Sequence, residues 1–135
     1  MSRSLVLIKP DAVKKNVIGK IITKYEDNGL KVLALEMKKI TKDFAKIHYA
    51  EHKGKGFYDE LIKFITSGPL CVLILEGENA VEKIREINGK TDPILAQEGT
   101  IRKLYATDKT KNAVHASDSL ESAKREIKLW FGEEY

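Results

Sequence analysis

The chain has 135 residues, of which 42% are hydrophobic and 33% charged, with 24 Lys and Arg against 20 Asp and Glu for a formal charge of +4. This length predicts one domain, residues 1–135, that buries a core without disulfides or metals. The charges are interspersed, so the small positive excess does not by itself indicate a nucleic-acid-binding protein. No segment is apolar enough to span a membrane, and no signal-peptide pattern is present. These features exclude a membrane protein and predict a cytoplasmic location.

The first half of the chain predicts two strands and three helices. The apolar run 4–8 predicts a buried strand, which the Lys9-Pro10 pair ends. Asp11 is expected to cap a helix with an apolar stripe, and Gly29 to end it. The elements expected next, in chain order, are a strand within 30–40 and helices over 41–53 and 57–66.

The second half predicts two further strands, around a region without a sustained period. The run 70–75 predicts a strand, and Cys71 within it is expected to be a buried thiol in a reducing compartment. Residues 90–111 show no period and are long for a structureless connection, which favours a functional loop. The remaining predicted elements are helices over 79–87 and 119–131 and a short strand over 113–116. This order predicts an α+β fold, a ferredoxin-like sandwich with a four-stranded antiparallel sheet covered by helices.

The segment 112–119, N-A-V-H-A-S-D-S, places a histidine between a short apolar run and a helix start. Asp118 is the expected N-cap, and Glu121 completes a pair of the capping-box type. Free backbone N–H groups at such a start favour anions, phosphate included. Imidazole is a nucleophile that is largely neutral near pH 7, so His115 beside an anion site indicates phosphoryl transfer. The alternative is a core or surface histidine next to an ordinary helix cap.

Two other strings match known motifs. Gly89-Lys90-Thr91 resembles the end of a P-loop, but the earlier glycine of that motif is absent and the flanking elements are in the wrong order, which excludes it. The string 48–52, H-Y-A-E-H, matches H-x-x-E-H, a zinc-peptidase pattern whose third ligand could be Glu121 or Glu126. A histidine pair on a helix surface is the ordinary alternative, and a chain of this size has little room for a peptide cleft.

Four side chains suited to phosphate are scattered along the chain. Arginine binds phosphate oxygens in a bidentate manner, and lysine supplies a point charge. They are Lys9, Arg85, Thr91 and Arg102. Each of them taken alone is expected to be an ordinary surface residue. They indicate a phosphate site only if the fold brings them beside His115. An RNA-binding sheet is a further alternative, but the central strand candidates offer no aromatic residue for it.

The segment around His115 closely resembles the N-x-x-H-[GA]-S-D-S signature of the nucleoside diphosphate kinase family. Other strings of that family occur here in the same order: L-V-L-I-K-P-D-A-V, H-Y-A-E-H, S-G-P before an apolar strand, G-K-T-D-P and G-T-I-R. The resemblance covers nearly the whole chain, whose length is that of a short bacterial-type member. It implies a reversible transfer of the terminal phosphate from a nucleoside triphosphate, typically ATP, to a nucleoside diphosphate.

The resemblance also implies the residues that carry this reaction. Nδ1 of His115 attacks the γ-phosphate and holds it as a phosphohistidine, which is ping-pong catalysis. Glu126 matches the acidic residue that hydrogen-bonds the other ring nitrogen. The residues that match the phosphate contacts are Lys9, Tyr49, Arg85, Thr91 and Arg102. Those that match the contacts to the sugar hydroxyls are Lys9 and Asn112.

By the same resemblance, Phe57 matches the aromatic on which the base stacks, with Leu61 nearby. Stacking discriminates little between bases, because every base has a π-face. The implied cofactor is Mg²⁺, carried on the nucleotide phosphates without a direct protein ligand. Asp118 is expected to reach it through water, and Ser117 to support the histidine by hydrogen bonding.

The chain departs from the family pattern between the glycine-rich string and the histidine. Lys103-Leu104-Tyr105 stand where the family usually has Gly-Asp-Phe or Gly-Asp-Tyr, a usually apolar position near Lys109 and close to the base is charged, and Glu98 replaces a proline. This region tends to make subunit contacts in the family. The resemblance implies a homo-oligomer, a hexamer or a tetramer of dimers, with no membrane and no specific nucleic acid as partner. The departures therefore bear on assembly, while the nucleophile and phosphate ligands are kept.

Overall fold

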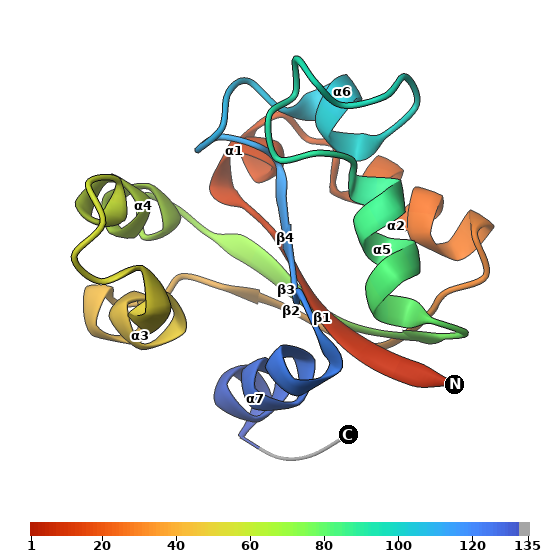
Figure 1. Cartoon of the computed structure of the whole chain (residues 1–135), viewed down its shortest axis with the longest axis horizontal. Coiled ribbons are helices and arrows are strands. Elements are labelled where there is room, and N and C mark those ends of the chain that lie inside the picture. Colours follow the sequence, from red (N-terminus) through yellow and green to blue (C-terminus); the bar gives the residue numbers. More distant parts are fainter. Residues whose placement is uncertain (133–135) are drawn as a thin grey trace.

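A four-stranded antiparallel sheet with strand order β2-β3-β1-β4 forms the centre of the computed structural model, which describes residues 1–132 (Figure 1). The central strand β1 pairs with β3 over its whole length and with β4 over Val6–Ile8. The strands are β1 (Ser2–Ile8), β2 (Lys31–Lys38), β3 (Leu70–Gly77) and β4 (Val114–Ala116). The predicted α+β fold with a four-stranded antiparallel sheet is confirmed.

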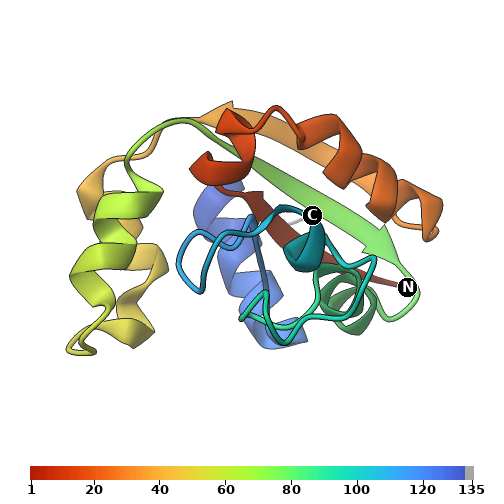
Figure 2. The same cartoon turned by 90° about the horizontal axis from the view of Figure 1, so that it is seen from above.

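Both faces of the sheet are covered by helices. Side chains alternate along β1, so Val6 and Ile8 join a core cluster on one face while Leu5 and Leu7 join a cluster on the other. Helices α3 and α4 lie together at one end of the molecule, away from α2 and α5 (Figures 1 and 2). The helices are α1 (Pro10–Lys14), α2 (Ile18–Asp27), α3 (Lys42–His48), α4 (Tyr58–Ile65), α5 (Ala80–Asn88), α6 (Ile101–Tyr105) and α7 (Leu120–Phe131), with a 3₁₀ turn, η1, over Ala50–His52.

The single helix predicted from Asp11 to Gly29 is wrong in its first part. Asn16 has a φ of 59° and separates α1 from α2, because asparagine tolerates the left-handed region that a continuous helix excludes. Asp11 does not cap α1. Its side chain is buried and its Oδ2 accepts a hydrogen bond from the Ala113 backbone N–H at 3.0 Å, far along the chain.

The other differences from the predicted elements are also local. The helix predicted over 41–53 ends at His48 and continues only as the η1 turn. The region 90–111 contains one short helix, α6, which begins after Thr100, whose Oγ1 caps it. The N-cap of α7 is Ser119, whose Oγ accepts from the Ser122 N–H at 3.0 Å, so the expected Asp118 cap is wrong. Within residues 1–132, no helix has both the length and the apolar character needed to cross a membrane.

Candidate active site

His115 lies in the middle of β4 and is anchored from α7. Its Nε2 lies 2.9 Å from Oε1 of Glu126, which is 5% exposed, and Ser117 Oγ donates to the same oxygen at 3.0 Å. An ionised carboxylate only accepts hydrogen bonds, so the proton of this pair belongs on Nε2 of the ring. Nδ1 then has a free lone pair and no hydrogen-bond partner within residues 1–132. The arrangement is that of an oriented nitrogen nucleophile.

The short strand β4 turns His115 away from its two neighbours. Val114 and Ala116 pair with Ile8 and Val6 and belong to the core cluster of one face. Alternation along the strand therefore sends His115 to the opposite face, where α7 packs on the sheet. The preceding Ala113 has a φ of 73°, a conformation that costs free energy for a residue with a Cβ. Asp11 and the backbone of Lys9 hold it by hydrogen bonds to its N–H and its carbonyl.

A cleft of about 840 Å³ opens beside His115, a volume within the range of small-molecule sites. The His115–Glu126 pair and every residue expected to contact the nucleotide or its Mg²⁺ border it: His115, Glu126, Lys9, Tyr49, Phe57, Leu61, Arg85, Thr91, Arg102, Asn112 and Asp118. These residues come from strand β4, helices α4 to α7 and the connecting segments, including Lys9, which directly follows β1. The scattered basic residues are thus brought to one place by the fold.

Lys9 and Arg102 make the inner part of the cleft cationic. Lys9 is 5% exposed, and its Nζ donates to Asn112 Oδ1 at 2.9 Å. Burial, and then the charge of Arg102, lower the pKa of Lys9 to about 8. Arg102 donates to the carbonyls of Gly89 and Val114 at 2.9 and 2.8 Å, while its buried Nε has no partner among the described residues.

Two aromatic side chains also line the cleft, Phe57 at its surface and Tyr49 buried. Phe57 is 45% exposed, and its ring lies 5.8 Å below the Nζ of Lys55. Tyr49 is buried, which raises the pKa of its hydroxyl, and the nearby charge of Glu126 raises it further. An exposed phenylalanine at the edge of a cleft offers a surface on which a planar ring can stack.

Three carboxylates border the cleft, and they differ in what they can bind. Glu126 already accepts from His115 and Ser117, and Glu51 faces His52 at 3.9 Å. Asp118 has a lowered pKa, because the Ser122 hydroxyl, and then that of Ser119, hydrogen-bond its ionised form. One available carboxylate beside several cations is too few for a magnesium site made by the protein alone. It fits Mg²⁺ brought by phosphates, since this ion is usually held by one or two carboxylates plus substrate oxygens.

The structure also shows a residue whose place the sequence did not predict. His48 is 8% exposed, and its ring meets that of His115 with centroids 4.7 Å apart and planes at 77°. The H-x-x-E-H string had paired His48 with His52, but α3 ends at His48 and His52 stands on the η1 turn. The two histidines therefore do not share one turn of a helix as the zinc pattern requires.

Comparisons with known proteins agree with this geometry. A sequence model of the family described as nucleoside diphosphate kinase matches residues 2–135. The chain belongs to the nucleoside diphosphate kinase family. The predicted membership is thus confirmed.

Relatives of this family resemble the chain over nearly its full length. A nucleoside diphosphate kinase of Clostridium perfringens is 60% identical over 131 residues, which are 97% of this chain and 92% of that protein. One of Saccharolobus islandicus is 49% identical, covering 97% and 95% of the two chains. The crystal structure of the Aquifex aeolicus nucleoside diphosphate kinase matches with a TM-score of 0.92 at 42% identity, covering 95% of this chain and 93% of that one. The fold of the family is therefore the fold of this chain.

Proposed function

We propose that this chain is a nucleoside diphosphate kinase that moves a terminal phosphate from a nucleoside triphosphate to a nucleoside diphosphate through a phosphohistidine on His115. The observation that carries the proposal is the His115–Glu126 hydrogen bond of 2.9 Å at the wall of a cationic cleft. The cleft offers an oriented nucleophile, a phosphate-binding surface and an exposed aromatic ring.

In the first half-reaction, the lone pair on Nδ1 of His115 attacks the γ-phosphorus in line with the leaving oxygen. The N–P bond forms as the bond from phosphorus to the β-phosphate oxygen breaks, and the electron pair leaves with the nucleoside diphosphate. The ring gains positive charge, which the buried carboxylate of Glu126 stabilises through Nε2–H. The second half-reaction is the reverse, with another nucleoside diphosphate as the attacking group.

The remaining residues of the cleft divide between the parts of the nucleotide. Lys9, Arg85, Arg102, Thr91 and Tyr49 are proposed to contact the phosphates. Positive charge there offsets the negative charge of the equatorial oxygens during transfer. Lys9 and Asn112, already bonded to each other, are proposed to contact the sugar hydroxyls.

At the cleft mouth, Phe57 is proposed to stack on the base, with Leu61 beside it. Mg²⁺ bound to the nucleotide would neutralise phosphate charge, and Asp118 is the residue proposed to hold it through water. The cytoplasmic location and the homo-oligomer, hexamer or tetramer of dimers, implied by the family belong to the same proposal.

The test is incubation of the protein with γ-labelled ATP and magnesium. We expect label on the protein that is lost in acid, kept in base and absent from His115→Ala, because a phosphorus–nitrogen bond on that ring carries it. His52→Ala is a useful comparison for the site of labelling, since this second histidine also borders the cleft but lacks a carboxylate as close as Glu126. Label that survives in His115→Ala would contradict the proposal.

A further inference from the structure

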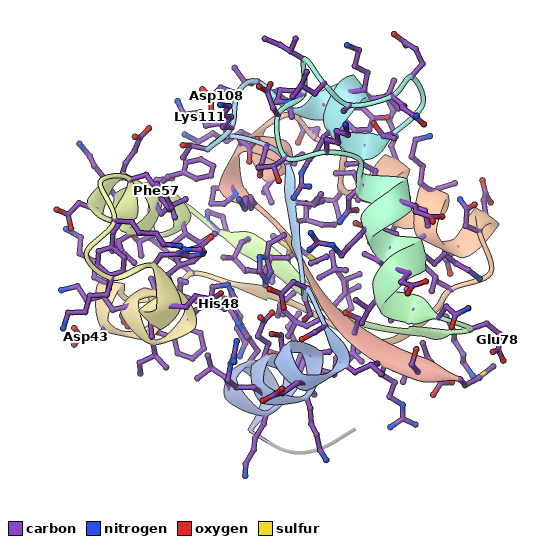
Figure 3. All side chains as sticks on the ribbon, viewed as in Figure 1. Asp43, His48, Phe57, Glu78, Asp108 and Lys111 are labelled. Atoms are coloured by element: carbon purple, nitrogen blue, oxygen red, sulfur yellow. The ribbon has the colours of Figure 1, made fainter. Side chains whose placement is uncertain are left out.

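His48 supports the His115 ring without reaching the cleft. The two rings meet edge to face, and His48 is not among the residues that border the cleft. Figure 3 shows His48 at the edge of α3 that is nearest to the sheet and α7. A single hydrogen bond from Nε2 to Glu126 leaves the His115 ring free to turn about that bond. The edge-to-face contact with His48 restricts this rotation.

Trp130 determines where the proton of His48 lies. The Nε1–H of Trp130 lies 3.1 Å from Nδ1 of His48, in a buried contact. An indole nitrogen only donates, so Nδ1 of His48 is the acceptor and carries no proton. Burial, and to a smaller extent the nearby cations of Lys9 and Arg125, hold the pKa of His48 well below its ordinary value, which keeps the ring neutral. A neutral ring with an unprotonated Nδ1 has its proton on Nε2.

This tautomer matters because His48, His115 and Glu126 have the composition of a metal site. One ligand atom from each of the three lies within 4.8 Å of the others, and two histidines with a carboxylate are a typical zinc set. Nε2 of His48, the nitrogen not used by Trp130, has no hydrogen-bond partner within residues 1–132. A protonated nitrogen has no lone pair for a metal, so the Trp130 bond closes the site to cations.

We propose that the Trp130–His48 hydrogen bond is a tautomer lock that makes His48 a neutral positioning residue for His115 and prevents divalent metals from binding at His48, His115 and Glu126. The inference rests on the proposed role of His115 as nucleophile. A metal on that histidine would occupy it and block phosphorylation, so the lock protects the nucleophile as well as orienting it.

The test compares the wild type with Trp130→Phe, which keeps an aromatic ring in place and removes the donor. Histidine ¹⁵N–¹H NMR should show the His48 proton on Nε2 in the wild type and a mixture of tautomers in the variant. Cobalt(II), added without nucleotide, should give the visible absorption of a tetrahedral site only in the variant. Adding His48→Phe to Trp130→Phe should abolish this absorption.

The positioning role has its own kinetic readout. His48→Phe should slow phosphorylation of His115 in a single turnover by about tenfold or more, because misplacement of a reacting group is costly. In the same single-turnover experiment, the concentration of magnesium-ATP that gives half of the maximal rate should stay unchanged, because His48 does not border the cleft. Phe44→Leu is the matched control. It disturbs the ring that packs on Trp130 at 4.7 Å but leaves the hydrogen bond, so the labelling rate and the tautomer should be kept.

Two results would overturn the inference: cobalt absorption in the wild type, or wild-type labelling rates in His48→Phe. Wild-type protein that never becomes labelled would instead refute the proposed function. The NMR and cobalt measurements need no phosphoryl transfer, so they decide the lock in either case.

Discussion

At the scale of single residues, Lys9 shows how burial adjusts a group for phosphate binding. Its ammonium group is nearly inaccessible and lies near Arg102, so the charged form is disfavoured and the pKa falls from 10.5 to about 8. An incoming phosphate supplies the negative charge that the protein lacks there. In the free protein the pKa of Lys9 therefore lies close to neutral pH, and a bound nucleotide favours the charged form of its amine.

This pKa predicts the pH dependence of nucleotide use. The ratio kcat/KM reports the free protein, so it should fall as pH rises through about 8, where Lys9 loses its charge. Stability should change in the opposite sense. Between about pH 8 and 10.5 the unfolded chain binds the proton that folded Lys9 has lost, so this group's contribution to the free energy of unfolding rises with pH. A kcat/KM that stays level through pH 8 would contradict this role for Lys9.

At the scale of elements, the structure separates two neighbouring residues at the start of α7. Ser119 caps the helix through its Oγ, whereas Asp118 borders the cleft. The sequence could not separate them, because serine and aspartate are equally good N-caps and stand side by side. The same kind of ambiguity hid α6, since a helix of five residues is too short to show a period.

The two residues should respond differently to replacement by alanine. Ser119→Ala should lower the free energy of unfolding by about 1 kcal/mol, the usual cost of a lost N-cap, with magnesium-dependent activity largely kept. Asp118→Ala should weaken the response of activity to magnesium, with a smaller loss of stability. Urea unfolding and a magnesium titration measure the two effects. Equal stability losses without a change in magnesium response would show that both residues only support the helix.

At the scale of the whole molecule, strands and core followed from the sequence more readily than the site did. Apolar runs such as 70–75 predict buried strands, because the strand is covered on both faces. The cleft residues lie far apart in the chain, and no spacing rule places Lys9 beside Arg102 or His48 beside His115. Only the resemblance to a family grouped the cleft residues. The position of His48 beside His115 was not predicted, because the H-x-x-E-H pattern paired His48 with His52.

Cys71 offers a probe of the whole fold. It lies on β3, one of the two inner strands of the sheet, is 1% exposed, and burial raises the pKa of its thiol to about 11. We expect no reaction of the native protein with a thiol reagent near pH 8, and reaction at the rate of global unfolding in denaturant, because β1 and β2 cover both edges of this strand. Fast reaction under native conditions would show that the centre of the sheet opens locally.

The most direct test of the account is transfer from the isolated phosphoprotein. Labelled protein, freed of ATP and then given only a nucleoside diphosphate and magnesium, should pass its label to that nucleotide, with one triphosphate formed for each phosphate lost from His115. The same result is expected with different bases, because stacking on Phe57 is tolerant. Label that stays on the protein, or that is released only as inorganic phosphate, would contradict a phosphohistidine acting as carrier between two nucleotides.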